Sequence, residues 1–339
     1  METTTTLDEQ AFRRIVDPYR AELYAHCYRM LGSLQDAEDA LQNALLGAWR
    51  GLPSFEGRAG VRSWLYKIAT NACLDVIARR PKRVLPIDGG SPSRFEDGAG
   101  EPLVESVWVE PYPDEKLGLA DGYAAPEATY EQREAVELAF IAALQHLPAR
   151  QRAVLILREV LGFSAREVAD SLDTTVQSVN SALQRSRQTL GERLPERSQQ
   201  ATLRSLGEPR VRELVQRYVD AWERHDVDAI VAMLAEDVVI SMPPFPHWFR
   251  GPEIIVHGAS NPECGFSLQR RHIPLRANGQ LAVAVYQWDE EARSLLPVAI
   301  EVLALGGDRV IESTGFLDTG LFVHFGLPAE LPPPVSSPA

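Results

Sequence analysis

Two helix start signals that stand ten residues apart constrain the fold of this chain more than any other feature. Ser164 and Thr174 are each followed three residues later by Glu or Gln, which is the spacing of a capping box. In that motif two side chains satisfy free backbone N–H groups at the start of a helix. We therefore predict helices over 165–172 and 175–190, joined by a tight turn around Asp173. Such a pair forms a helix-turn-helix.

The spacing of apolar residues assigns the two faces of this helix pair. The predicted core consists of Val168, Ala169, Leu172, Val179 and Leu183. The outer face of the second helix carries hydroxyl, amide and guanidinium groups, which can reach base edges and phosphates in a major groove. These candidate DNA-contacting residues are Thr175, Gln177, Ser178, Ser181, Gln184, Arg185 and Arg187. The alternative is an ordinary helical hairpin whose polar side is merely solvated.

The N-terminal part also reads as helical. Apolar residues recur at helical spacing over 12–80, with breaks at two glycine-containing turns and no alternating strand pattern. Ser33 is placed to cap one helix, with the Asp36 carboxylate near its free N–H groups. A later helix begins at Val61 and stops before Pro81. Its predicted apolar face is Trp64, Leu65, Ile68, Ala72 and Val76.

The charge is unevenly distributed along the chain. A net charge of -13 argues, taken whole, against a nucleic-acid partner. Residues 62–83, however, carry six basic side chains against Asp75 alone, while residues 84–130 carry two basic and ten acidic ones. The acidic stretch is rich in Gly, Pro and Ser, so we expect an extended linker without a packed core. Helical periodicity returns over 131–194.

The C-terminal part mixes helices and strands. Helical patterns over 210–225 and 227–235 follow a polar joint at 195–209. Five strand-like runs come next, at 238–242, 268–275, 281–288, 296–305 and 309–317. Helices followed by several strands predict an α+β domain. The proline-rich end is expected to be disordered.

Several classes of protein are disfavoured. The sequence has no run of some eighteen apolar residues and no basic start leading into an apolar stretch, so we expect neither a membrane partner nor a secretory signal, and a cytoplasmic location. Cys27, Cys73 and Cys264 lie far apart without a CxxC pair, which argues against a disulfide framework or a zinc site. No metal or cofactor is expected.

Two helical stretches resemble parts of one protein family. The sequence Leu-Pro-Ala-Arg-Gln-Arg at 147–152, with Gly-Phe-Ser-Ala-Arg-Glu-Val-Ala at 162–169, resembles the promoter-reading region four of bacterial sigma factors. The stretch at 32–42 resembles the region-two helix that grips the clamp of core RNA polymerase, and the stretch at 62–75 resembles its minus-ten-reading helix. The resemblance implies a sigma factor of the extracytoplasmic-function type that binds core polymerase and promoter DNA.

The same resemblance assigns roles to individual residues. The residues expected to contact the beta-prime clamp of the polymerase are Asp36, Glu38, Asp39 and Gln42. Contact with minus-ten DNA falls to Phe55, Arg58, Arg62, Lys67, Asn71, Arg79 and Arg80. Region four is expected to read minus-thirty-five DNA next to the beta flap. The physical alternative for the acidic group is a favourably charged helix start, and for Trp64 it is core packing.

The C-terminal part resembles a SnoaL-like (NTF2-like) cone, in which a curved sheet wraps around helices. The candidate proton-transfer groups are His225, Asp226, Asp237, His247, His257 and Glu301. No acid and base stand out as a pair, so we expect no catalytic residue and no enzyme activity. The resemblance implies instead that the cone regulates polymerase activity in cis, and it leaves open a small-molecule ligand in the cavity.

The expected fold class is thus multidomain, with two all-α sigma domains and an α+β cone. The predicted boundaries are 10–83, 84–130 for the linker, 131–195, 208–328 and 329–339 for a disordered tail. One alternative is a ligand-sensing helix-turn-helix regulator that works without polymerase. Another is a cyclase or isomerase with helical accessory domains.

Overall fold

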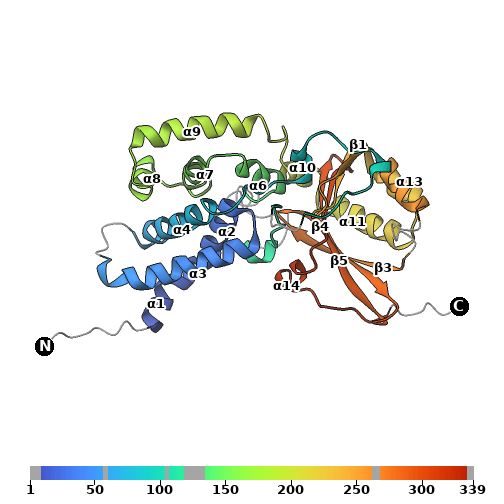
Figure 1. The fold of residues 1–339 in the computed structure, drawn as a ribbon, viewed down its shortest axis with the longest axis horizontal. Coiled ribbons are helices and arrows are strands. Elements are labelled where there is room, and N and C mark those ends of the chain that lie inside the picture. The colour runs from blue at the N-terminus through green and yellow to red at the C-terminus, as the bar shows by residue number, and fades with distance from the viewer. Residues whose placement is uncertain (1–8, 56–59, 104–106, 118–133, 262–267, 334–339) are drawn as a thin grey trace. The chain divides into compact units, whose positions relative to one another are not determined.

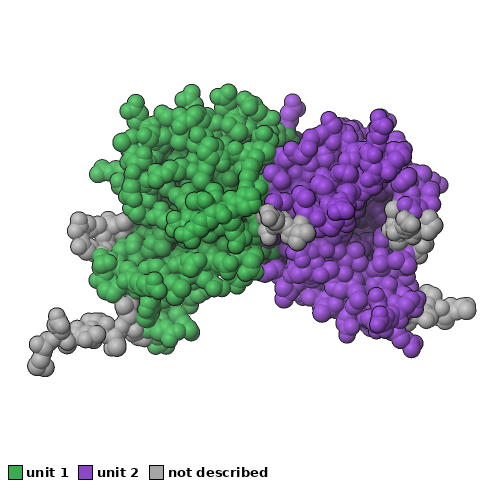
Figure 2. Space-filling model, in the orientation of Figure 1, with its two compact units in different colours: residues 1–83, 116–119, 138–195 green, residues 84–115, 120–137, 196–339 purple. Residues whose placement is uncertain are grey.

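The structure is a computed structural model that describes residues 9–55, 60–103, 107–117, 134–261 and 268–333 (Figure 1). It divides into two compact units (Figure 2). Unit 1 comprises residues 1–83, 116–119 and 138–195, and unit 2 comprises residues 84–115, 120–137 and 196–339.

The regular secondary structure in the described residues of unit 1 is helical. Its helices are α1 (Glu9–Val16), α2 (Arg20–Leu31), α3 (Leu34–Gly51), α4 (Val61–Ile77), α6 (Leu138–Gln145), α7 (Ala149–Leu155), α8 (Ala165–Ser171) and α9 (Val176–Gly191). Short 3-10 turns lie at Asp17–Tyr19 and Leu52–Ser54, and a π-helical turn at Ile156–Val160 continues α7. Helices α2, α3 and α4 pack on one another, and α4 also contacts α7 and α8. The two helical stretches of the sequence therefore share one packed unit.

The turn between α2 and α3 follows from two residues. Gly32 adopts φ 69°, a left-handed conformation that favours glycine, and its N–H donates to the Tyr28 carbonyl at 2.7 Å to end α2. Ser33 then caps α3, because its Oγ accepts from the Asp36 N–H at 3.2 Å. The predicted cap is confirmed.

The buried face of α4 differs from the predicted one. Its buried residues are Leu65, Tyr66, Ala69, Thr70 and Cys73. The rest of the predicted apolar face is half-buried: Trp64, Ile68, Ala72 and Val76. Helix α4 is covered by α2 and α3 on one side and by α7 and α8 on the other. The buried residues of α4 therefore lie between these two pairs of helices. A periodicity argument that assumes a single covered face misplaces that stripe.

Unit 2 is built around a six-stranded sheet. Its helices are α10 (Gln199–Leu206), α11 (Glu208–Glu223), α12 (Val227–Met233), α13 (Glu253–Ser260) and α14 (Leu321–His324). Its strands are β1 (Leu234–Ser241), β2 (Trp248–Arg250), β3 (Arg270–Ala277), β4 (Gln280–Asp289), β5 (Ser294–Gly306) and β6 (Arg309–Phe316). The strand order is β2-β1-β6-β5-β4-β3, and the β1–β6 pair alone among these neighbours is parallel.

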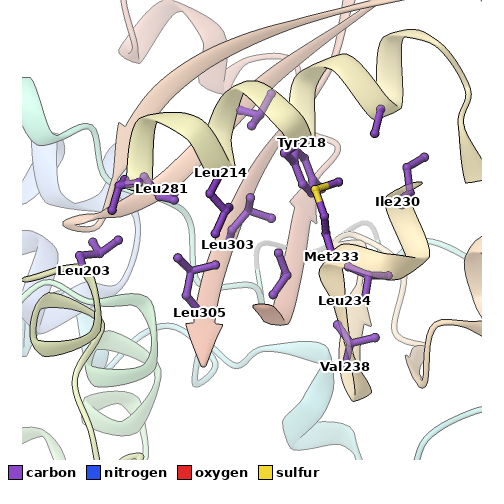
Figure 3. Close-up of a cluster of buried hydrophobic side chains, with 14 residues drawn as sticks. Leu203, Leu214, Tyr218, Ile230, Met233, Leu234, Val238, Leu281, Leu303 and Leu305 are labelled. Atoms are coloured by element: carbon purple, nitrogen blue, oxygen red, sulfur yellow. The ribbon is translucent and has the colours of Figure 1, made fainter. Parts of the chain in front are cut away.

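A cluster of buried apolar side chains joins α11 to this sheet (Figure 3). Leu214 and Tyr218 of α11 meet Leu303 and Leu305 of β5, and Met233 extends the cluster at the end of α12. Burial of each such side chain contributes about 1.5–3 kcal/mol of transfer free energy. This cluster is the core that holds the helices against the sheet.

The acidic segment differs from the expected extended linker. Residues 84–115 belong to unit 2, with 3-10 turns at Pro86–Gly89 and Phe95–Asp97. Val109 and Tyr112 are fully buried, and Pro113 pairs with Ala277 at the edge strand β3. A few apolar residues within a polar stretch are enough for packing when an exposed strand edge is available to cover.

The α+β class and the helical class are both confirmed, and five strands match the predicted runs closely. Helices α10, α13 and α14 and the three-residue strand β2 were not predicted. The start of the expected disordered tail is also ordered, because Leu331 exchanges backbone hydrogen bonds with Leu295 at 2.9 and 3.0 Å. Residues 334–339 lie outside the described residues.

Candidate polymerase and nucleic-acid interfaces

The helix-turn-helix forms as predicted, with one shift. Ser164 and Glu167 make the capping box at the start of α8: the Glu167 N–H donates to Ser164 Oγ at 3.2 Å, and the Ser164 N–H donates to Glu167 Oε2 at 2.8 Å. Asp173 forms the turn at φ 48°. The second start signal lies at Thr175 and not at Thr174, because Thr175 Oγ1 accepts the N–H that caps α9.

The outer face of α9 is exposed to solvent. The predicted inner residues of the helix pair are all buried: Val168, Ala169, Leu172, Val179 and Leu183. The seven predicted DNA-contacting residues are all exposed: Thr175, Gln177, Ser178, Ser181, Gln184, Arg185 and Arg187. One of them is engaged within the unit, since Arg187 pairs with Glu159 at 2.5 Å. The spacing of apolar residues was enough to predict which side chains are buried and which are exposed, because α9 is covered on a single side.

Helix α4 directs two of its basic side chains toward the helix-turn-helix. Lys67 Nζ donates to the Asp170 carbonyl and to Asp173 Oδ1, both at 2.9 Å. Arg62 donates to Glu22 Oε2 and to the Leu161 carbonyl, each at 3.4 Å. These cations therefore face acidic and carbonyl oxygens of unit 1.

Aromatic contacts reinforce the position of Arg62. Its guanidinium lies 5.1 Å from the ring centre of Tyr66 and 4.7 Å from that of Phe163, the residue just before the capping box of α8. A guanidinium at these distances is attracted to the ring faces. Ser63 adds a hydrogen bond of 3.3 Å to Glu167. The predicted minus-ten helix is thus attached to α8 by several contacts.

The remaining predicted minus-ten residues are scattered. Asn71 and Arg79 are exposed, and Phe55 stacks on Trp64 with ring centres 4.6 Å apart. Arg80 instead pairs with the carboxylate of Asp36. The predicted residue Arg58 lies outside the described residues.

The predicted acidic group on α3 splits into two parts. Glu38, Asp39 and Gln42 are exposed on the helix. Asp36 is 3 % exposed, and its two oxygens pair with Arg80 and, at 2.7 Å, with Arg83. Arg83 is itself only 5 % exposed. The structure therefore places Asp36 in a buried ion-pair cluster and not on the exposed acidic face.

One residue of unit 1 that sequence reasoning missed is Arg152. It is 4 % exposed, and it donates to the Met30 carbonyl at the end of α2 and to the Oε1 and carbonyl oxygens of Gln145. These bonds tie α7 to α2. In the sequence Arg152 stands two residues from Arg150 in the same basic motif, and nothing there marks it as the buried one.

The candidate proton-transfer groups of unit 2 do not assemble into a site. Asp226 caps α12 by accepting from the Ala229 N–H at 3.0 Å, and His247 bonds the Gly98 carbonyl at 2.8 Å. Glu301 is half-buried, desolvation of its carboxyl raises the pKa of that group, and Ser313 donates to it at 2.6 Å. The other candidates lie elsewhere: Asp237 is exposed on β1, His257 stacks on Phe95, and His225 bonds the Leu268 carbonyl.

In the part of the chain that the structure describes, no group of three or more His, Cys, Asp or Glu side chains could hold a metal ion. None of the described helices is long and apolar enough to cross a membrane.

Three family models match this chain: sigma-70 region 2 over residues 15–83, sigma-70 region 4 over 137–190, and a SnoaL-like domain over 215–310. The ECF RNA polymerase sigma factor SigG of Mycobacterium tuberculosis is 42 % identical over 321 residues, covering 94 % of this chain and 85 % of SigG. The ECF sigma factor SigW of Bacillus subtilis is 29 % identical, covering 55 % of this chain and 90 % of SigW.

One solved structure resembles the whole fold. The crystal structure of the Mycobacterium tuberculosis extracytoplasmic function sigma factor SigJ aligns with a TM-score of 0.58 at 19 % identity. The alignment covers 95 % of this chain and 100 % of SigJ. This alignment supports a fold that combines helical parts with a SnoaL-like domain.

The buried Asp36 cluster predicts a difference between two neighbouring carboxylates of α3. Asp36→Ala removes the carboxylate that pairs with the buried guanidinium of Arg83, so it should lower the free energy of unfolding of unit 1 by about 3–5 kcal/mol. Asp39→Ala, at an exposed position, should change it by less than about 0.5 kcal/mol. Chemical denaturation followed by circular dichroism measures both. Equal effects of the two substitutions would contradict the buried cluster.

Proposed function

The chain belongs to the extracytoplasmic-function sigma factors, and from this membership we propose that it binds core RNA polymerase, directs it to promoters and initiates transcription. Sigma factors are initiation factors and not enzymes. The observation that carries the proposal is the exposed polar face of α9, which presents seven groups suited to base edges and phosphates. The chain also contains sigma-70 region 2, which precedes region 4 as it does in the family.

In this proposal, two exposed surfaces bind different partners. Glu38, Asp39 and Gln42 on α3 bind the polymerase, because they are the members of the acidic group that a partner can reach. The outer face of α9 binds the upstream promoter element. Basic side chains of α4 and of the segment after it attract the backbone of the minus-ten region, and such binding weakens with salt because counterions are released.

Helix α4 and the helix-turn-helix must separate before they bind promoter DNA. Lys67 and Arg62 of α4 are occupied by Asp173, Glu22 and carbonyl oxygens within unit 1. The same side chains are those proposed to contact minus-ten DNA. Packing of α4 on α8 thus competes with promoter binding, and engagement with polymerase releases it.

Contacts inside unit 2 support regulation in cis by the SnoaL-like domain. The Tyr112 N–H donates to Asn278 Oδ1 and the Asn278 N–H donates to the Tyr112 carbonyl, both at 2.8 Å. Asn278 also donates to the Val136 carbonyl at 2.7 Å. One buried side chain of the cone therefore holds the middle and the end of the segment that joins the two sigma regions.

Further contacts fix other parts of the same segment. Ser93 donates its N–H to the Trp248 carbonyl at 2.8 Å, and the Trp248 indole donates to the Gly90 carbonyl at 3.1 Å. Asp114 accepts from the Gly279 N–H at 2.7 Å. Residues 84–115 cannot extend between two separated sigma regions while they are bound in this way. We infer that the cone restrains initiation until the segment is released.

The division of roles predicts opposite defects for two sets of substitutions. Combined Arg185→Ala and Arg187→Ala should lower promoter-dependent run-off transcription at least about tenfold, because each lost base or phosphate contact costs about 1–3 kcal/mol. Co-elution with core polymerase should persist. Combined Glu38→Ala, Asp39→Ala and Gln42→Ala should abolish co-elution. Absence of any promoter-dependent transcript with the unaltered chain would refute the proposed function.

Release of the joining segment predicts a gain of activity. Asn278→Gly tolerates the positive φ of 55° at this position but removes the side-chain bonds to Tyr112 and Val136. Transcription at equal polymerase concentration should therefore rise. Gln216→Ala, at an exposed position on α11 of the same domain, is the matched control and should leave transcription unchanged. Lower or unaltered transcription with Asn278→Gly would contradict restraint by the cone.

A further inference from the structure

A pocket of about 400 Å³ lies within unit 1, between its two helical regions. The start of α3, the end of α4 and the following residues 80–83 form one wall, and the turn between α6 and α7 forms the other. Its volume falls in the range of small-molecule sites in proteins. Regulation by the cone does not use this pocket, and among the residues predicted to contact minus-ten DNA Arg80 alone lines it.

The lining of the pocket is strongly cationic. Arg80, Lys82, Arg83 and Arg152 line it, with Asp36 as the one carboxylate among the lining residues. Asp36 pairs with Arg80 and Arg83, one oxygen to each. The pocket thus keeps a net positive charge of three in a chain whose total charge is -13. Such a concentration of charge of one sign attracts a multiply charged anion.

Arg152 adds an independent observation. Its described hydrogen-bond partners are the neutral oxygens of Met30, Gln145 and Leu147, and no ion pair is found for it among the described residues. Its buried Nε has no hydrogen-bond partner there. Burial lowers the pKa of Arg152 to about 10, so the group is still a cation at neutral pH. A buried cation without a counter-charge is costly, and an anion in the pocket would offset that cost.

We propose that this pocket binds a small phosphorylated anion of the nucleoside polyphosphate class. Guanidinium groups match phosphate oxygens by charge and by paired N–H donors, and Lys82 at the rim adds a point charge. Apolar side chains of Val76, Ile77 and Leu147 line the rest of the pocket and suit the non-phosphate part. The anion bridges both walls and so stabilises the packed form of unit 1.

A free anion suits this pocket better than the backbone of nucleic acid. Arg83 and Arg152 are 5 % and 4 % exposed, so two of the four cations lie at a depth that surface side chains in contact with a duplex do not have. A small anion can enter a recess of this volume. The site is independent of polymerase binding, so its presence and the proposed function can be tested separately.

Isothermal titration of the full chain tests the proposal. The probes are inorganic pyrophosphate and ATP, each without divalent cations and at constant ionic strength. A single-stranded oligonucleotide without terminal phosphates serves as the nucleic-acid arm. Combined Arg80→Ala and Lys82→Ala removes two pocket cations, and Arg79→Ala is the matched control, because Arg79 is exposed on the same segment and does not line the pocket.

We expect the unaltered chain and the Arg79→Ala variant to bind ATP and pyrophosphate alike, and the double variant to bind at least about tenfold more weakly, because two charge-assisted bonds are lost. Lys82→Gln alone keeps the Asp36 cluster intact and should still weaken binding, which guards against a folding defect in the double variant. No binding at millimolar anion, equal binding by all variants, or binding of the oligonucleotide alone would overturn the proposal.

Discussion

The packing of α4 against the helix-turn-helix is the constraint on which the rest of the structure depends. Lys67 contacts both the last turn of α8 and Asp173 in the turn to α9, while the Arg62 guanidinium lies against Phe163. These contacts hold the two sigma regions in one helical unit. They also engage the cations that we propose to contact minus-ten DNA, and under that proposal promoter binding and this packed form exclude each other.

We propose that the SnoaL-like domain influences that equilibrium through the segment between the sigma regions. Asn278 bonds Tyr112 near the middle of the segment and Val136 near its end. Residues 84–115 are thereby held on the domain and cannot extend while these contacts persist. In the proposed regulation, a domain whose fold is shared with enzymes acts through hydrogen bonds to the backbone of the joining segment.

The sequence predicted features that depend on local chemistry. The cap at Ser33, the capping box at Ser164, the turn at Asp173 and the exposed face of α9 all follow from residues within a few positions of one another. Features that depend on distant partners were missed. The buried stripe of α4 reflects cover from two sides, and burial of Asp36 depends on Arg83, which lies 47 residues further along the chain. The packing of residues 84–115 depends on an edge strand whose exposure no local pattern records.

The most direct test of this account is the distance between α4 and α9, measured by double electron–electron resonance with spin labels at positions 75 and 188. Asp75 and Gln188 are exposed on their helices, and Cys27 and Cys73 are buried, so replacing Cys264 by Ser restricts labelling to the two introduced cysteines. The account predicts one short distance in the free protein and a longer one when core polymerase is bound. The same distance in both states would contradict it.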